Sequence, residues 1–491
     1  MTIFLVGHTY RFAAEQMLFT LFPGEKPITI EEPDLSVIRY PERYLLSSFS
    51  VAEGQLCAEA QLRHEGRLAQ GSARLPVPDS TDPLAFSREA QKAVKLAFYR
   101  AALAFLPKPR WGALTGVRPV KLAARVLRQG GDWNSARENL MTQYDVDAQE
   151  ASLAATCAVY SHKADGELEP EGIALYVGIP FCPTRCAYCS FVSAAVGKDV
   201  HRLGPYLEAL HQELAALGQS LARQGAVIRS VYIGGGTPTT LDAVQLGALL
   251  TQICASLDLS ACREFTLEAG RPDTITEEKL RLLANFPVTR ISVNPQTMHE
   301  STLAVIGRRH TAEQTRKAFA LVAAQAPQLL VNADLIMGLP GETADMFRQS
   351  LDEVIALAPA NITVHALSIK RSADLTGHSA TQDTLEGMYA HSIEALQKNG
   401  YSPYYLYRQK DMGGSFANIG WTKPGGESLY NLCMMEELCT TAAAGGTGIS
   451  KLVNRKSGKI VRKSNPKFAA EYVTRIGHTI EEKEATQWLI S

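Results

Sequence analysis

The sequence predicts an α/β protein whose central part is a partial barrel of six β-α units, open on one side. Between residues 173 and 368, short β-rich runs alternate with longer segments whose apolar residues recur at helical spacing. This alternation is typical of right-handed β-α-β units and a parallel sheet. Most of the runs end in glycine, proline or polar residues, and in α/β barrels such strand ends build the active site. The six predicted strands are 173–179, 230–235, 264–270, 290–296, 329–338 and 361–368.

Two further blocks flank the predicted barrel, because 491 residues are enough for two or three domains. Residues 1–170 predict an N-terminal α/β domain of unknown role, which begins with a strand-like run and continues with a helix over 11–22. The barrel is expected over 171–375. Residues 376–491 predict an α+β extension that covers the substrate, with one helix over about 381–398 and another at the end.

The composition excludes several classes of protein. Hydrophobic residues make up 46% and charged residues 20% of the chain, as in ordinary globular proteins. The net charge of −1 gives no general attraction to nucleic acid or to membrane surfaces. No apolar stretch reaches the roughly 18 residues of a membrane helix, and the first residues lack the basic leader of a signal peptide. We therefore expect a cytoplasmic protein with no membrane span and no nucleic-acid partner.

Three cysteines, Cys182, Cys186 and Cys189, stand in the string GIPFCPTRCAYCSF directly after the first predicted strand. Three thiolates spaced C-x3-C-x2-C on one loop can ligate three corners of an iron–sulfur cluster and leave one iron for a small molecule. A zinc site would use four ligands, bacterial ferredoxins use another spacing, and nothing marks the chain as secreted and disulfide-bonded. The spacing favours a cluster, and the six scattered cysteines predict free thiols.

Glycines and a carboxylate follow the ends of the next two strands. The string YIGGGTPTT contains Gly235, Gly236 and Thr237 at the end of the second strand. Glycines there let the backbone approach a ligand closely, although a tight turn would also explain them. Glu268 ends the third strand, where pairing with a local cation would be the purely structural explanation.

Polar residues also mark the later strand ends. Gln296 ends the fourth strand, Asp334 lies in the fifth, and Arg308 follows in the string IGRRH. Because Arg309 is adjacent, the sequence leaves open which arginine points inward. Tyr176 in the first strand is explained equally well by a place in the core.

Together and in this order, these strings resemble the radical-SAM superfamily and, within it, the oxygen-independent coproporphyrinogen III oxidase/dehydrogenase family. The resemblance covers about 173–450. The strings WGALTGVRPVKL, ISVNPQT, YYLYRQKDM and LYNLCMMEE look like the HemZ-type coproporphyrinogen dehydrogenase subgroup. Two departures are visible: Gly178 stands where other members often carry histidine, and Ser190-Phe191 follows the last cysteine where they have Gly-Cys.

The resemblance implies a partial (β/α)6 TIM-like radical-SAM barrel with an additional N-terminal α/β domain and a C-terminal α+β extension. It implies that the three cysteines bind a 4Fe-4S cluster. The implied reaction is oxidative decarboxylation of two propionates of coproporphyrinogen III to vinyl groups, giving protoporphyrinogen IX, with a flavodoxin- or ferredoxin-like electron donor. Cluster and adenosyl radical carry this chemistry, so no catalytic side chain is predicted. The implied contacts of S-adenosylmethionine are Tyr176, Gly235, Gly236, Thr237, Glu268, Gln296, Arg308 and Asp334.

A tetraanionic tetrapyrrole substrate requires cationic partners, and arginine binds carboxylates through two parallel hydrogen bonds. The run YYLYRQKDM mixes aromatic and basic residues, so Tyr405, Tyr407 and Arg408 are predicted to contact the substrate. Each further candidate is explained as well by a solvated surface charge. These further candidates are Arg118, Lys121, Lys370, Arg371 and Lys410.

Three other functions are weighed against this one. A heme chaperone of the same family would carry an HN-x2-YW string, but the comparable place reads YNLCMMEE (430–437) and lacks histidine. A radical-SAM enzyme that acts on RNA would need a basic stripe, which the balanced charge disfavours. A cluster-binding regulator without catalysis would not need the cofactor contacts.

Overall fold

The computed structural model describes residues 1–34, 40–79, 82–189, 193–368, 380–408 and 416–490. Ser190, Phe191, Lys370, Arg371 and Lys410 lie outside the described residues. The chain divides into two compact units. The first comprises Met1–Ala155 together with Arg408, and the second comprises Thr156–Tyr407 and Phe416–Ser491.

The first unit is a five-stranded sheet on which two helices pack. The strand order is β2-β1-β3-β4-β5, with β1 parallel to both neighbours and antiparallel pairing from β3 to β5. Alternate apolar residues such as Ile3 and Leu5 pack against α1 and α2. The strand at the start and the helix over 11–22 are confirmed. The elements are β1 Thr2–Val6, α1 Arg11–Leu21, β2 Ile28–Glu31, β3 Tyr44–Ala52, β4 Gln55–His64, β5 Arg67–Pro76, α2 Pro83–Ala102, α3 Val120–Arg128, α4 Trp133–Tyr144 and α5 Ala148–Gly166, which continues into the second unit.

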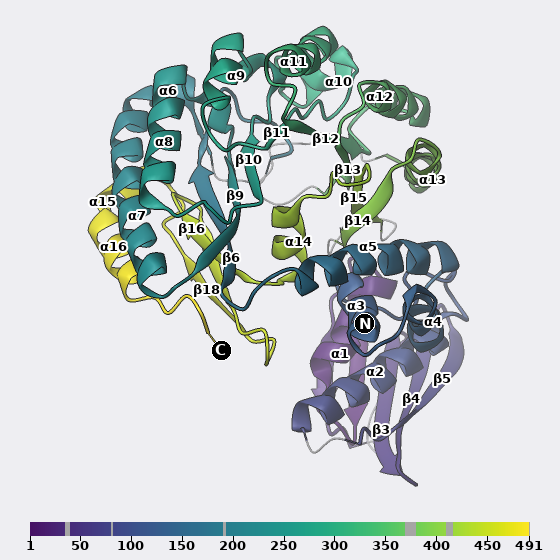
Figure 1. Cartoon of the computed structure of the whole chain (residues 1–491). Helices are drawn as coiled ribbons and strands as arrows, with labels where there is room; N and C mark the ends of the chain where they lie inside the picture. The colour runs from purple at the N-terminus through teal and green to yellow at the C-terminus, as the bar shows by residue number, and fades with distance from the viewer. Residues whose placement is uncertain (35–39, 80–81, 190–192, 369–379, 409–415, 491) are drawn as a thin grey trace. The chain divides into compact units, whose positions relative to one another are not determined.

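The second unit is built on one sheet of eleven strands, in the order β14-β15-β13-β12-β11-β10-β9-β6-β16-β17-β18 (Figure 1). The strands from β16 through β6 to β13 run parallel, and β15, β17 and β18 are antiparallel to their neighbours. All six predicted strands are confirmed. They are β6 Gly172–Ile179, β9 Val227–Gly235, β10 Glu264–Glu268, β11 Arg290–Ser292, β12 Leu330–Met337 and β13 Asn361–Ala366.

Helices connect the parallel strands and lie outside the sheet, as a partial (β/α)6 barrel requires (Figure 1). Their starts are marked by polar caps: Asp242 and Gln245 form a reciprocal capping box, as do Thr311 and Gln314. The helical elements are α6 Val196–Asp199, η1 Val200–Arg202, α7 Leu203–Arg223, η2 Pro238–Thr240, α8 Ala243–Ser256, η3 Pro272–Thr274, α9 Glu277–Leu283, α10 Glu300–Val305, α11 Ala312–Gln325, α12 Ala344–Ala356 and α13 Gln382–Lys398. Two short strands, β7 Phe181–Cys182 and β8 Ala194–Ala195, pair with each other in parallel.

The C-terminal residues continue the barrel sheet. β16 lies parallel beside β6 as a seventh parallel strand, which the sequence did not predict. The substrate-covering role of residues 376–491 stays a prediction. No helix of the described chain is long and apolar enough to span a bilayer. The elements are β14 Ser402–Arg408, β15 Ala417–Thr422, α14 Leu429–Glu436, β16 Thr440–Ala444, β17 Ile449–Val453, β18 Ile460–Ser464, α15 Ala469–Thr474 and α16 Ile476–Glu484.

Candidate active site

The carboxyl ends of the parallel strands, called the rim below, bring most of the predicted site residues together. Tyr176 on β6 lies beside Tyr232 on β9, and Gly178 lies beside Gly234. Glu268 ends β10. Asp334 on β12 lies beside Thr363 on β13. Because parallel strands end at one edge, residues almost 160 positions apart share this rim.

The cluster loop, residues 182–189, is held against the glycine turn after β9. The N–H of Gly236 donates to the carbonyl of Ile179 at 2.8 Å, and the N–H of Thr237 donates to that of Phe181 at 2.7 Å. A Cβ on Gly236 would lie 2.4 Å from the Phe181 oxygen, and Gly235 has a φ of +113°. A side chain at position 236 is therefore excluded by the close approach of the Phe181 backbone, and one at position 235 would strain the backbone.

The three cysteines of the predicted cluster site share one short loop. Each is partly buried, and the N–H of Cys189 donates to the Cys186 carbonyl at 3.1 Å. Burial raises the pKa of the Cys182 thiol, which also hydrogen-bonds Ser193 and Thr237. In a 4Fe-4S cluster each thiolate binds a different iron, so three cysteines on one loop would leave the fourth iron open for a small molecule.

Two buried carboxyl groups, those of Glu268 and Asp334, lie at the rim. Burial, together with the nearby Asp334, raises the pKa of Glu268 to about 7. Glu268 accepts a hydrogen bond from the N–H of Gly235 at 3.3 Å. Burial also raises the pKa of Asp334, which has His365 at 3.9 Å. Two buried carboxyl groups are easier to ionise beside a cation, and S-adenosylmethionine carries an ammonium and a sulfonium group.

Two buried acceptors on the rim have no partner in the described structure. Gln296 is only 7% exposed and adopts a left-handed φ of +69°. Its backbone bonds the Asp334 carbonyl and the Ile336 N–H, which fixes it beside β12. The side-chain oxygens of Gln296 and Asn294 are buried without a hydrogen bond. Buried polar atoms are almost always satisfied, so these two suit a ligand with hydroxyl or amine donors.

The structure decides which of the adjacent arginines points inward. Arg308 is buried and Arg309 is exposed. The Arg308 guanidinium donates to the carbonyls of Gly270 and Asn294 at 3.0 and 2.7 Å and to the Tyr188 hydroxyl at 3.2 Å. Its positive charge also acts on the nearby Cys186 thiol. Arg308 therefore lies against the cluster loop.

A ladder of tyrosines lines the inner side of the sheet below the rim. The ring of Tyr176 stacks on Tyr232 with centroids 6.4 Å apart, and Tyr232 stacks on Tyr430 of α14 at 4.6 Å. The Tyr176 hydroxyl hydrogen-bonds Thr447, which follows β16. Helix α14 thus lies on the inner face of the sheet (Figure 1).

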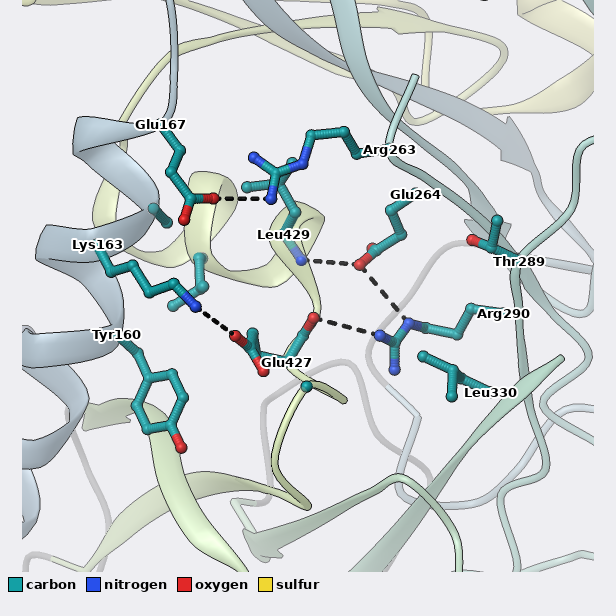
Figure 2. A pocket seen from close by; sticks show the side chains of 13 residues that line it. Tyr160, Lys163, Glu167, Arg263, Glu264, Thr289, Arg290, Leu330, Glu427 and Leu429 are labelled. Atoms are coloured by element: carbon teal, nitrogen blue, oxygen red, sulfur yellow. Dashed lines mark hydrogen bonds and ion pairs between the residues drawn. The ribbon is translucent and has the colours of Figure 1, made fainter. Parts of the chain in front are cut away.

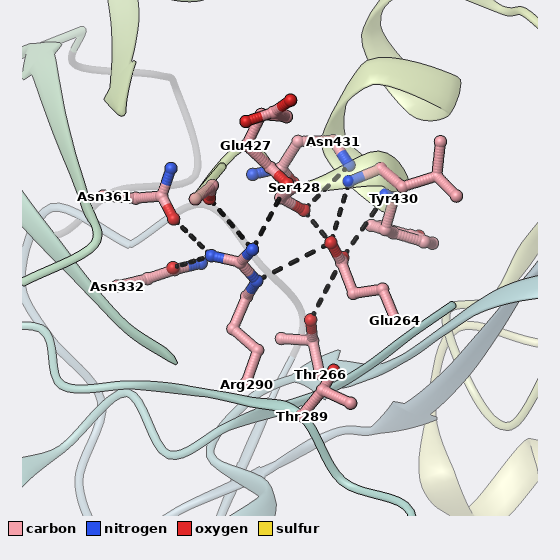
Figure 3. Close-up of polar contacts among 12 residues, drawn as sticks. Glu264, Thr266, Thr289, Arg290, Asn332, Asn361, Glu427, Ser428, Tyr430 and Asn431 are labelled. Carbon is pink, nitrogen blue, oxygen red and sulfur yellow. Dashed lines mark hydrogen bonds and ion pairs between the residues drawn. The ribbon is translucent and has the colours of Figure 1, made fainter. Parts of the chain in front are cut away.

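A buried ion pair at the amino ends of the strands anchors α14 (Figure 3). The carboxylate of Glu264 accepts from the N–H of Leu429 at 2.8 Å and the N–H of Tyr430 at 3.3 Å, and so satisfies the first turn of the helix. Arg290 lies 3.6 Å from Glu264 and also donates to the carbonyl of Gly426 at 2.9 Å.

A pocket of about 220 Å³ lies at the same end (Figure 2). Its charges face one another: Lys163 lies 3.6 Å from Glu427, and Arg263 lies 2.7 Å from Glu167. Glu264 and Arg290 form the third pair. Because these charges are paired and the pocket is remote from the rim, its contacts stabilise the barrel base.

The three candidate substrate residues differ in burial and in their neighbours. Tyr405 is buried, and its hydroxyl lies 3.0 Å from the Thr363 hydroxyl. Tyr407 is half-buried. Arg408 belongs to the first unit, where its guanidinium donates to the Leu114 carbonyl at 2.6 Å and lies 5.3 Å from the ring of Trp111. Substrate contact by these residues stays a prediction.

Several rim residues were missed by reasoning from the sequence. Thr363 and His365 are two positions apart on β13, so their side chains lie on the same face of the sheet, the face to which Asp334 points. That alternation, together with a histidine in a buried strand, was a usable signal. Tyr430 and Thr447 gave none, because only the fold brings the residues after position 420 back to the barrel.

Comparisons with known proteins agree with this geometry. Residues 176–354 match the family model described as the radical SAM superfamily. The chain is 37% identical over 422 residues to the oxygen-independent coproporphyrinogen-III oxidase-like protein HemZ of Bacillus subtilis, covering 83% of this chain and 82% of the relative. It is 31% identical over 264 residues to the heme chaperone HemW of Lactococcus lactis, covering 52% of this chain and 64% of the relative.

A solved structure shares the fold. The radical SAM enzyme coproporphyrinogen III oxidase (HemN) of Escherichia coli superposes with a TM-score of 0.51 at 20% identity, covering 66% of this chain and 73% of that chain. This chain belongs to the radical SAM superfamily and, within it, to the family of oxygen-independent coproporphyrinogen-III oxidase-like proteins. Its cofactors are a 4Fe-4S cluster and S-adenosylmethionine.

Proposed function

We propose that the protein oxidatively decarboxylates two propionate side chains of coproporphyrinogen III, which yields protoporphyrinogen IX without oxygen. The observation that carries the proposal is the rim, where the cluster loop, Glu268, Asp334 and His365 meet a tyrosine-lined inner wall. The similarity to HemZ over most of both chains supports it.

When bound, the cluster and S-adenosylmethionine would supply the radical chemistry that takes a hydrogen atom from the β-carbon of a propionate. The protein would orient both reactants and keep water away. Glu268, Gln296 and Asp334 would hold S-adenosylmethionine at the rim. Tyr176 and Tyr232 offer flat apolar surfaces on which pyrrole rings would pack. After losing its β-hydrogen, each carboxylate side chain would release carbon dioxide and one electron, and the electron would pass to an external acceptor.

The protein works in the cytoplasm in this proposal, with a flavodoxin- or ferredoxin-like protein as electron donor. The test is anaerobic incubation of the reconstituted protein with S-adenosylmethionine, a reductant and coproporphyrinogen III, followed by mass spectrometry. We expect stepwise loss of carbon dioxide and two hydrogens, twice per substrate. Cys254→Ala is the matched control that should retain activity. Cleavage of S-adenosylmethionine without any decarboxylated product would refute the proposed substrate.

The similarity to HemW makes heme binding the second candidate function. Its possible ligands on α14 are poorly placed. Cys433 is 1% exposed, and its hydrogen bond to Cys439, together with burial, raises its thiol pKa. The Met434 sulfur contacts the Lys451 ammonium at 2.9 Å. Titration with hemin separates the two functions: a stoichiometric Soret shift that Cys433→Ser abolishes would favour the chaperone.

A further inference from the structure

Two buried arginines contact the cluster loop. Arg271 follows β10 and is 2% exposed, and Arg308 follows α10 and is 9% exposed. The sequence assigned Arg308 to the cofactor and gave Arg271 no role. Buried guanidinium groups are costly unless their hydrogen bonds are satisfied, so the partners of each arginine indicate what it does.

Arg271 hydrogen-bonds the cluster loop while its own charge is paired with the Asp273 carboxylate. Its Nη1 donates to the Thr184 hydroxyl at 3.0 Å. Its Nε and Nη2 donate to the two carboxylate oxygens of Asp273 at 2.9 and 3.0 Å. The two-pronged pair fixes the guanidinium plane and cancels its charge, so Arg271 acts on the loop as a rigid hydrogen-bond donor.

Arg308 brings a positive charge to the loop and donates hydrogen bonds to three neutral groups. They are the carbonyls of Gly270 and Asn294 and the Tyr188 hydroxyl. The charge also acts on the nearby Cys186 thiol and on the carboxyl groups of Glu268 and Asp334. Cysteine binds iron as the thiolate, and in that state the guanidinium lies beside a negatively charged ligand sulfur.

The backbone before Arg308 also touches the loop. The N–H of Ala187 donates to the Ile306 carbonyl at 3.0 Å. Gly307 adopts a φ of +73°, and a Cβ there would lie 3.4 Å from the Arg185 oxygen. The segment from Ile306 to Arg308 therefore lies against the middle of the loop, on both sides of Cys186.

We propose that Arg271 and Arg308 clamp the cluster loop with separate tasks. Arg271 fixes the loop through Thr184. Arg308 places a positive charge near Cys186 and so raises the reduction potential of the bound cluster. Hydrogen bonds to the ligand sulfurs and the charge around a cluster both tune its potential. The clamp acts whichever substrate the enzyme uses.

The electrostatic task is tested by redox titration of the reconstituted protein, followed by electron paramagnetic resonance without S-adenosylmethionine. In Arg308→Gln, we expect the equilibrium for cluster reduction to fall at least tenfold, which is about 59 mV for a one-electron couple. Arg308→Lys keeps the charge and should shift less. Arg309→Gln, the exposed neighbour, should leave the potential unchanged. A wild-type potential in Arg308→Gln overturns the assignment.

Loss of the cluster in Arg308→Gln also gives an answer. If Arg308→Lys then loads normally, the positive charge is the property that the loop requires, as proposed. If neither variant loads iron, charge is not the deciding property and the electrostatic task is refuted.

The mechanical task is tested by the rate at which a ferrous chelator removes iron from the reconstituted protein. Arg271→Gln should release iron at least tenfold faster, while its potential should shift less than in Arg308→Gln, because the hydrogen bonds of the Arg271 guanidinium go to Thr184 and Asp273. Thr184→Ala removes the hydroxyl that accepts from Arg271 and donates to the Gly307 carbonyl at 3.5 Å. It should also release iron faster, which keeps the test open if Arg271→Gln does not fold. A wild-type release rate in Thr184→Ala, or a potential in Arg271→Gln as low as in Arg308→Gln, contradicts the separate tasks.

Discussion

Single residues at the rim owe their properties to neighbours that are distant in sequence. Glu268 and Asp334 stand on different strands, yet Asp334, in addition to burial, raises the pKa of Glu268. Arg308 and Arg309 are adjacent, yet one is buried against the cluster loop and the other is exposed. Substitutions of single side chains can therefore separate ligand binding from folding.

The three cysteines of the loop should be the only cysteine ligands of one 4Fe-4S cluster. We expect Cys182→Ala, Cys186→Ala and Cys189→Ala each to lose the cluster, because every thiolate binds a separate iron. Iron and sulfide content after anaerobic reconstitution checks this. Cys254→Ala and Cys262→Ala are controls that should bind normal amounts. Normal cluster content in any loop variant would disprove its assignment.

Glu342 should make stability depend on pH. Burial raises its pKa to about 7, one carboxylate oxygen has no partner in the described structure, and the other accepts from the Thr297 hydroxyl. The folded state binds the proton more tightly than the unfolded state, so stability falls as pH rises from about 4.5 through 7. Glu342→Gln stays neutral and should exceed wild type by up to about 2–3 kcal/mol at pH 8.

The measurement for Glu342→Gln is urea unfolding of both proteins between pH 5 and pH 8. The advantage of the variant should be smallest at pH 5, where the unfolded wild type is only partly protonated and the folded group is neutral. Parallel stability curves for the two proteins would show that Glu342 ionises freely in the folded state.

Arg408 should contribute to the stability of the first unit. Its guanidinium donates to the Leu114 carbonyl and packs on the Trp111 ring. Arg408→Ala removes a buried charge-assisted hydrogen bond, which costs about 1.5–3 kcal/mol of unfolding free energy. Chemical denaturation measures the loss, and porphyrinogen affinity in the same folded variant tests the predicted substrate contact. Unchanged stability with weakened affinity would return Arg408 to the substrate.

At the scale of elements, hydrophobic periodicity and strand ends were sufficient to locate the barrel strands, but α14 obtains its place from a capping interaction. The helix has only eight residues, which is too short to be stable alone. Glu264 and the Ser428 side chain satisfy its first N–H groups. This cap holds Tyr430 against Tyr232 on the inner wall.

Glu264→Ala should therefore release α14. It leaves Arg290 buried without its carboxylate, and breaking a buried pair in this way costs about 3–5 kcal/mol. Glu277→Ala, which breaks the exposed pair with Arg281 on α9, should cost about 0.3–0.5 kcal/mol. Urea unfolding measures both losses. Equal small losses in the two variants would show that α14 is held by its apolar contacts alone.

At the scale of the whole molecule, the C-terminal residues complete the sheet and the helical layer of the second unit. β16 is the second parallel partner of β6, and α15 and α16 pack against α7. Deletion of residues 376–491 should therefore prevent the second unit from folding, since it exposes the edge of β6 and removes α14. Circular dichroism and cluster reconstitution of the truncated protein check this. A folded, cluster-binding fragment would support the independent extension predicted from the sequence.

The sequence alone located the six barrel strands and the order of the rim motifs and predicted the cluster cysteines, because alternation, glycine turns and thiol spacing are local signals. Only the tertiary structure decided that Thr440–Ala444 is a parallel strand. Its sequence, TTAAA, ends in three alanines, which have low strand propensity, and its small residues suit the fully buried position beside β6. The inward arginine, the anchored helix α14 and the clamp on the cluster loop likewise depend on contacts between residues far apart in the chain, which no local pattern records.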